Sequence, residues 1–462
     1  MSSDQVVTAA ARAAAGAAAA AGDTAARAAA VGDTAAPAQA DSGVLANRDF
    51  VRLWAGETVS LIGTQVTQFA LPLVAILTLN ATVFEVGVLN ALRFLPLIPL
   101  SLLAGVLLDR RRRRPVLVVC ALGNAVLIGL VPLSSVTGLL SIGLLYVVTT
   151  LAGTLSMTFE VGALSYVPFL VEPGHLPAAN SRLWASTAVA GISGPGLAGL
   201  LVGLITAPIT LSVDAVSYLF SAASLISIRK QEPEPDPRAG RPSIRRSIAE
   251  GLRTVYGSKL LRTLLTQSAV FNLFYGAMLP VFLVYAVRVL GLSPAKLGIV
   301  VGAAAAGGLF GALLATRIAA ALGLGRAMAL ATIGVSAGPL LFAVPRGAGP
   351  LSIVVLVVAQ LVYGFNAAMF NVNAITLRQT VTPPRLLARM NATYRMVIYG
   401  VPLLGATGGG LLGSAVGLRP ALVILLVAMT SPAGWMFFAP VFRLKEMPLG
   451  PPLRQGMDGP HE

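Results

Sequence analysis

Charge is scarce in this chain of 462 residues. Only 11% of the residues are charged, 56% are hydrophobic, and the mean hydropathy is +0.82. Ordinary globular proteins carry about a quarter charged residues, because their surface faces water. The deficit predicts that lipid, rather than water, surrounds most of this chain.

Cysteine and histidine are almost absent. Cys120 is the only cysteine, which excludes an intramolecular disulfide, and His175 and His461 are the only histidines. Neither a thiolate cluster nor a histidine-based zinc site can be assembled from so few ligands. We therefore expect no metal and no cofactor. A clustered nucleophile or acid–base set at one depth is also missing, which argues against an enzyme.

The net charge of +15 raises the alternative of a nucleic-acid-binding protein. The basic residues, however, do not cover one domain but stand in short clusters between apolar segments, as in Arg110–Arg114. This placement is typical of the cytoplasmic loops of membrane proteins. We expect no nucleic-acid partner.

Beyond Arg52 the chain is a series of apolar segments, each long enough to cross about 30 Å of hydrocarbon as a helix. The predicted fold is therefore an all-α membrane protein with twelve transmembrane helices. The predicted spans are 53–79, 83–108, 115–134, 138–160, 184–205, 209–228, 262–288, 294–316, 326–345, 350–376, 393–415 and 420–441.

The distribution of Lys and Arg predicts the orientation. With the N-terminus in the cytoplasm, the cytoplasmic segments hold 28 of the 33 basic residues. Both termini are then cytoplasmic. Residues 1–46 are alanine-rich and lack aromatic residues, which predicts a disordered tail, and 442–462 form a second tail.

A polar linker at 229–261 separates the first six spans (47–228) from the last six (262–441). It begins with alternating acids and prolines, and then places Ile244, Ile248, Leu252 and Val255 at helical spacing between arginines. This pattern predicts an amphipathic basic helix suited to the inner membrane surface.

The two halves match each other at an offset of 211 residues. Residues 159–165 (FEVGALS) align with 370–376 (FNVNAIT), and the same shift brings Gly199 onto Gly410 and Gly87 onto Gly298. Six spans separate the copies, so both enter the membrane from the same side. Such parallel halves are typical of a rocking transporter with its binding site near the midplane, and predict two pseudo-symmetric six-helix bundles.

The loop after the second span, Gly105-x-x-x-Asp109-Arg110-x-x-Arg113-Arg114, resembles the signature loop of the major facilitator superfamily. The opening NRDFVRLWAGETVSLIG (47–63) is similar to that of its bacterial branch of enterobactin exporters and macrolide efflux proteins. Arg112 stands where the family usually has glycine. The resemblance covers about residues 47–445.

The resemblance implies a conformational latch at this loop, formed with Arg110 and its neighbours. Asp109 would meet the start of the eleventh helix near 392–394, where helix amides attract a carboxylate. Arg113 would pair with Glu160 while the cavity faces outward, and would release it as the cavity opens inward. The alternative is that the arginines only determine topology.

Two ionisable residues lie deep in predicted spans. Arg93 is near the midplane, where an arginine costs about 2.5–3.5 kcal/mol on insertion scales, and Asp214 is the nearest unassigned acid by depth. A fixed ion pair and a role in binding substrate or protons both remain open. Glu57, one of a polar stripe on the first span, is the best proton-carrier candidate because desolvation favours the neutral acid.

The resemblance implies that spans one, four, seven and ten line the substrate cavity. Their polar faces mix amides, hydroxyls and aromatic rings with few charges, which suits a large amphiphilic organic molecule; packing between helices is the alternative. The candidates are Thr64, Gln68, Tyr146, Met157, Asn272, Tyr275, Tyr363, Asn366, Phe370 and Asn373, together with Arg93.

The fifth span contains Gly191-Ile-Ser-Gly194-Pro195-Gly-Leu-Ala198-Gly199, which partly resembles the antiporter signature of the family. Ala198 replaces a usual glycine. Small residues allow close helix contact and proline bends a helix, so we expect a packing motif here.

Together these features predict a monomeric, multi-pass protein of the bacterial plasma membrane that exports small organic molecules, drug-, macrolide- or siderophore-like, in exchange for protons. Lipid would be its main surroundings. An importer or facilitator of an organic nutrient is the nearer alternative, because fold and orientation do not determine direction. A membrane enzyme or a lipid flippase is the more distant one.

Overall fold

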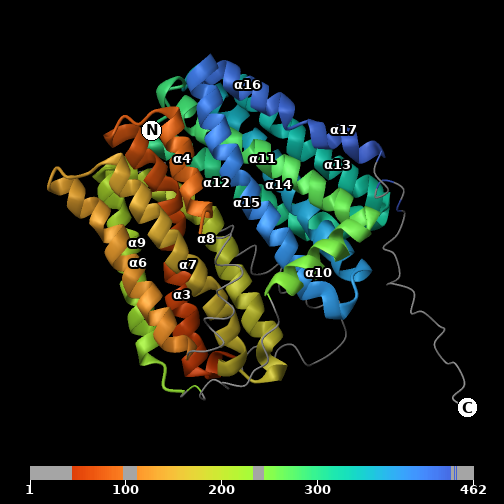
Figure 1. Cartoon of the computed structure of the whole chain (residues 1–462). Coiled ribbons are helices and arrows are strands. Elements are labelled where there is room, and N and C mark those ends of the chain that lie inside the picture. Colours follow the sequence, from red (N-terminus) through yellow and green to blue (C-terminus); the bar gives the residue numbers. More distant parts are fainter. Residues whose placement is uncertain are drawn as a thin grey trace, which may run out of the picture.

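The computed structural model describes residues 44–96, 112–230, 232, 244–438, 442 and 444. Within these residues the secondary structure is entirely helical, which confirms the predicted all-α fold (Figure 1). The helices are α3 (Arg48–Leu73), continued by a π-helical turn (Val74–Thr78), α4 (Val83–Phe94), α6 (Arg113–Val136), α7 (Ile142–Leu170), a 3-10 turn (Pro173–His175), α8 (Leu176–Ile205), α9 (Ala207–Ser227), α10 (Ile244–Gly257), α11 (Lys259–Arg288), α12 (Pro294–Leu322), α13 (Leu324–Ala337), a 3-10 turn (Gly338–Ala343), α14 (Pro350–Val381), α15 (Pro384–Val416), α16 (Leu418–Ala428) and α17 (Ser431–Phe438).

Ten helical segments of the described chain are long and apolar enough to cross a membrane. They coincide with ten of the twelve predicted spans. The predicted span 83–108 is described only as far as residue 96, where α4 has ended. In place of the predicted span 420–441 stand the shorter apolar helices α16 and α17.

Short polar side chains mark where these apolar helices begin. Asn47 accepts hydrogen bonds from the amides of Asp49 and Phe50 at the start of α3. Thr82 and Glu85 form a reciprocal capping box at the start of α4. Caps of this kind satisfy amides that have no partner within the helix.

Two sets of helices pack mainly among themselves. In the first group, α3 packs on α8 and α9, and α6 packs on α7 and α9; in the second group, α12 packs on α14, α11 on α15, and α13 on α14. The groups touch each other chiefly where α4 meets α15 and where α8 meets α12. Figure 1 shows the first group in red to yellow-green and the second in green to blue.

Glycines bring these crossing helices close together. A Cβ on Gly87 of α4 would lie 2.5 Å from the carbonyl oxygen of Ala406 and 3.2 Å from the Cα of Gly410 on α15. A Cβ on Gly298 of α12 would lie 3.2 Å from the Cα of Gly199 on α8. The 211-residue repeat therefore relates one crossing to the other, because it aligns Gly87 with Gly298 and Gly199 with Gly410. They lie on the side of the molecule where α4 begins, here called the α16 side.

The same repeat appears in two helix-to-helix turns on the α16 side. Thr206, between α8 and α9, has φ 81° and ψ 156°, and Gly417, between α15 and α16, has φ 88° and ψ 160°. These backbone angles are almost confined to glycine. Gly417 adopts these angles without strain, whereas Thr206, the equivalent residue of the first half, adopts them with a side chain.

On the opposite side, here called the α10 side, the start of the linker is bound to the first helix group. The backbone amides of Arg229 and Lys230 donate to the carboxylate of Asp49, and the Lys230 ammonium donates to the carbonyls of Phe169 and Leu170. These bonds join the ends of α3, α7 and α9.

The later part of the linker contains α10, which packs on the second helix group. Val255 is buried in an apolar cluster with Leu261 and Tyr394, and Glu250 forms an ion pair with Arg389 of α15. A Cβ on Gly251 would lie 2.7 Å from the Arg389 carbonyl oxygen. This part of the apolar face of α10 is thus covered by protein rather than by lipid.

Candidate functional site

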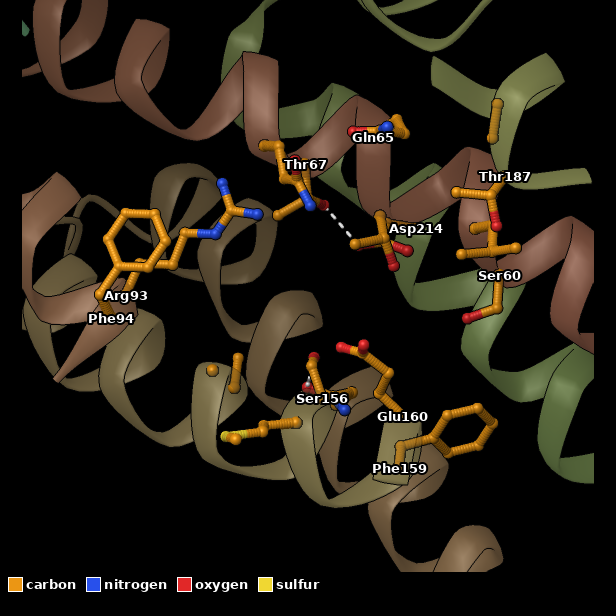
Figure 2. Close-up of a pocket in the computed structure, with 18 of the residues that line it drawn as sticks. Ser60, Gln65, Thr67, Arg93, Phe94, Ser156, Phe159, Glu160, Thr187 and Asp214 are labelled. Carbon is orange, nitrogen blue, oxygen red and sulfur yellow. Dashed lines mark hydrogen bonds between the residues drawn. The ribbon is translucent and has the colours of Figure 1, made fainter. Parts of the chain in front are cut away.

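A cavity of about 550 Å³ lies between the two helix groups. Its wall comes mostly from α3, α4, α6, α7, α8 and α9 of the first group, while α15 of the second group supplies Arg395, Met396, Tyr399 and Gly400. Of the residues predicted from sequence for the cavity or for proton coupling, Glu57, Thr64, Gln68, Arg93, Met157 and Asp214 line it. Figure 2 shows part of this wall.

Two carboxylates face the cavity from neighbouring helices. Glu57 of α3 has its Oε2 atom buried without a hydrogen-bond partner. Glu160 of α7 is exposed to the cavity, and its side chain forms neither a hydrogen bond nor an ion pair with any other described residue. A buried carboxylate oxygen without a partner is costly, so a proton or a ligand that binds there lowers the free energy of the site.

Asp214 of α9 is different, because its carboxylate is satisfied. It is 1% exposed and accepts hydrogen bonds from Thr67 Oγ1 at 2.5 Å and from Ser217 Oγ at 3.0 Å (Figure 2). Two hydroxyl donors compensate in part for its removal from water. A Cβ on Gly63 of α3 would lie 2.5 Å from the Asp214 Oδ1 atom, so only glycine leaves room for this acid.

Arg93 does not pair with Asp214, contrary to the ion pair considered from depth alone. Within the described residues Arg93 has no acid within 4.0 Å, and its guanidinium lies 5.7 Å from the centre of the Phe94 ring. The Asp214 oxygens instead accept hydrogen bonds from hydroxyls of α3 and α9. Arg93 therefore faces the cavity as a cation without a partner acid.

A chain of hydroxyls and one amide connects four helices in the wall of the cavity. Tyr218 OH lies 3.0 Å from Thr64 Oγ1 and 3.2 Å from Ser156 Oγ, and Ser156 donates to Asn124 Oδ1 at 3.3 Å. Sequence reasoning missed Tyr218, Ser156 and Asn124. The signal for Tyr218 and Ser156 was their position one helical turn from Asp214 and Glu160 respectively, whereas Asn124 stands among apolar residues. A polar residue in such a position does not by itself distinguish a wall residue from a packing contact.

The other predicted cavity residues do not line this cavity. Three of them donate hydrogen bonds to backbone carbonyls: Tyr146 to Glu85, Asn272 to Ser268 and Asn373 to Met369. Tyr275 and Tyr363 stack on each other with ring centres 5.2 Å apart. Asn366 packs against Gly334, and Phe370 packs in apolar clusters of the second group. In this conformation the second group contributes through α15 instead.

The residues of the predicted latch are only partly described. Asp109 and Arg110 lie outside the described residues. Arg113 lies 3.6 Å from Glu232, whose Oε2 atom also accepts from the backbone amide of Arg113 at 2.6 Å. A carboxylate is stabilised at a helix N-terminus, and Glu232 occupies that of α6. Glu160 lines the cavity instead of pairing with Arg113.

The glycines of the fifth span contact both helix groups. A Cβ on Gly194 would overlap the side chain of Gln65 on α3, and one on Gly199 would lie 3.1 Å from the Cα of Gly298 on α12. Gly191 has wider spacing, with Ala305 at 3.7 Å. Pro195 is buried, and its carbonyl oxygen contacts Gly298. The segment packs α8 against its neighbours.

The apolar helices, the cavity between two helix groups and the charged side chains within its wall define a membrane transport protein. The family model of the Major Facilitator Superfamily matches residues 53–406, and the chain belongs to this family. It is thus a multi-pass membrane transporter, and not an enzyme.

Two relatives in sequence are named as exporters, and a solved transporter structure shares the fold. The chain is 27% identical over 398 residues to the multidrug efflux pump Tap of Mycolicibacterium fortuitum, covering 84% of this chain and 94% of Tap. It is 26% identical over 324 residues to the enterobactin exporter EntS of Escherichia coli O1:K1 / APEC, covering 66% of this chain and 73% of EntS. The crystal structure of the nucleoside transporter NupG matches with a TM-score of 0.70 at 12% identity, over 86% of this chain and all of NupG.

Proposed function

We propose that this protein is a secondary active exporter that moves small amphiphilic organic molecules across the bacterial plasma membrane in exchange for protons. The observation that carries the proposal is a cavity between the two helix groups whose wall combines apolar surface with the unpartnered carboxylate of Glu57. The relatives named as a multidrug efflux pump and an enterobactin exporter support the outward direction.

Transport would proceed by alternating access between two six-helix bundles, 47–228 and 262–441, joined by the linker 229–261. Twelve spans would place both termini and α10 in the cytoplasm. The close glycine crossings on the α16 side support an inward-open conformation, in which the cavity is reached from the α10 side.

Closing the α10 side would complete the cycle through the latch. In the present conformation Arg113 is bound by Glu232. In the outward-open conformation, Arg113 would exchange this partner for Glu160, while Asp109 would bind the start of α15 and Arg110 would lie beside it. The latch would then stabilise only one of the two conformations, as a switch requires.

Glu57 is the proposed proton carrier, and Asp214 is the second candidate. A carboxyl group at Glu57 has no hydrogen bond to lose on protonation, because its buried Oε2 atom has no partner. Asp214 would have to exchange its bonds to Thr67 and Ser217. We expect protonation of Glu57 to release an exported molecule by removing a charge from the cavity wall.

Inside-out membrane vesicles test this function. With the vesicle interior acidified, the vesicles should accumulate an amphiphilic dye, and dissipating the pH gradient should abolish the accumulation. Glu57→Gln should remove the dependence on the gradient, whereas the matched variant Glu172→Gln, at an acid that is 86% exposed and away from the cavity, should transport as the parent does. If accumulation in vesicles with Glu57→Gln still depended on the pH gradient as in the parent, the role of Glu57 would be refuted.

A further inference from the structure

Among the residues that the structure describes, the cavity wall carries charges of both signs that have no ion-pair partner. Arg93 of α4 and Arg395 of α15 supply cations, and Glu57 and Glu160 supply anions. Within the described residues no ion pair joins any of these four. Asp214 is the remaining charged residue of the wall, and its oxygens are occupied by hydroxyl donors.

Arg93 is the cation that most needs a counter-ion from a ligand. It is half-buried, whereas Arg395 is exposed. A guanidinium withdrawn from water without an acid is costly, and a ligand carboxylate would offer it paired hydrogen bonds. Figure 2 shows the Arg93 side chain among the residues that line the cavity.

Glu160 provides the opposite pole at a different level of the cavity. The backbone of Arg93 contacts the position of Gly153 on α7, and Glu160 follows seven residues later on the same helix. Seven residues span about 10 Å along a helix. Figure 2 shows the Glu160 carboxylate directed into the cavity, apart from Arg93.

Apolar and aromatic side chains line the cavity as well. Phe94 and Met157 come from the first helix group, and Met396 and Tyr399 come from α15. A ligand that matches this wall therefore has an apolar body and two opposite charges set well apart, unlike the adjacent charges of an α-amino acid.

We propose that the cavity recognises amphoteric organic molecules, with an anionic group bound at Arg93, a cationic group bound at Glu160 and an apolar body between them. This inference rests on the proposed export function and names the substrate class of the same site. Arg93 and Glu160 become its specificity-determining residues.

The test uses four probes that share one biphenyl body and differ only in charge. An aminomethyl-biphenyl-carboxylic acid with its groups at opposite ends is the amphoteric probe; its methyl ester is the cation, its N-acetyl derivative the anion, and the N-acetyl methyl ester the neutral form. Binding to the full chain in lipid nanodiscs is measured by calorimetry. The amphoteric probe should bind at least about tenfold more tightly than either singly charged form. Equal affinities for all four probes would overturn the inference without any variant.

Variants then assign each pole. Arg93→Gln should abolish the preference for the amphoteric probe over its methyl ester. Glu160→Gln should abolish the preference over the N-acetyl acid. Arg395→Gln is the matched control. If Arg395→Gln, and not Arg93→Gln, abolished the preference for the amphoteric probe over its methyl ester, the assignment of the anionic group to Arg93 would be overturned. Arg93→Lys, which keeps the charge, should retain part of the preference.

Failure of this inference is separable from failure of the proposed function. If inside-out vesicles accumulate a dye on acidification but the four probes bind alike, export stands and the amphoteric preference falls. If the vesicles accumulate nothing while the amphoteric probe binds selectively, the coupled export is wrong and the site assignment stands.

Discussion

The glycine crossings make a quantitative prediction about the balance between the two conformations. In Gly87→Ala, the new Cβ would lie 2.5 Å from the Ala406 carbonyl oxygen, whereas ordinary contacts begin near 3.4 Å. The α4 and α15 backbones must therefore separate by about 0.9 Å. Because the repeat relates Gly298 to Gly87, Gly298→Ala should force a similar separation of α12 from α8.

The expected size follows from the cost of overpacking, about 1–3 kcal/mol. This cost applies only in the conformation that contains the crossing, so it acts fully on the conformational equilibrium. Since 1.4 kcal/mol corresponds to a factor of ten, each substitution should raise the population open on the α16 side by roughly 5- to 150-fold. Both substitutions should act in the same direction and to a similar degree.

Cysteine labelling in intact cells measures this population. Cys120 is 3% exposed and would be replaced by serine, and Asn90→Cys would introduce a thiol in the cavity wall. An impermeant maleimide added outside the cell should then label Gly87→Ala faster than the parent. Gly408→Ala is the matched control, because a Cβ there meets nothing within 4 Å.

Unchanged labelling in both glycine variants, with thermal stability retained, would refute the view that these crossings hold the α16 side closed. An increase in only one of the two would refute the symmetric role that the repeat assigns to them.

Two further predictions concern the α16 side. Arg288 donates a 2.7 Å hydrogen bond across the helix groups to the Ala81 carbonyl. Hydrogen bonds from charged groups contribute about 1.5–3 kcal/mol, and less where water competes, as it does at the exposed Arg288 side chain. Arg288→Gln should therefore raise the same labelling rate several-fold, and Arg346→Gln should not. Thr206→Gly should remove backbone strain of about 1 kcal/mol and raise the Tm in detergent by roughly 1–3 °C. Gly417→Ala should lower the Tm. A lower Tm for Thr206→Gly would contradict the strain at that turn.

The helical fold was predictable because the membrane imposes a simple requirement. A segment that crosses hydrocarbon must satisfy its own backbone, so apolar runs of sufficient length read directly as helices. The repeat indicated which glycines are equivalent in the two halves, because an offset of 211 residues aligns Gly87 with Gly298 and Gly199 with Gly410. In the structure these glycines form the two crossings, Gly87 with Gly410 and Gly199 with Gly298.

The cavity was harder to predict because depth and helix face do not determine which polar groups meet. Arg93 and Asp214 lie at compatible depths, yet hydroxyls from Thr67 and Ser217 satisfy the acid. Tyr218 was overlooked because an aromatic residue on a largely apolar helix is usually interpreted as a packing residue. Its hydrogen bonds to Thr64 and Ser156 depend on the rotation of α9 against α3 and α7, which the sequence does not encode locally.

The two halves of the repeat have kept the same packing but not the same chemistry. Glu160 corresponds to Asn371 under the 211-residue shift, and Arg93 corresponds to Ala304. The second half thus has neutral residues where the first half supplies charges to the cavity wall. If rocking only requires equivalent contacts between the halves, whereas recognition requires charges at particular places, then substitutions at the crossings should act in symmetric pairs. Substitutions in the cavity should act one at a time: exchanging Glu160 should alter selectivity, whereas exchanging Asn371 should not.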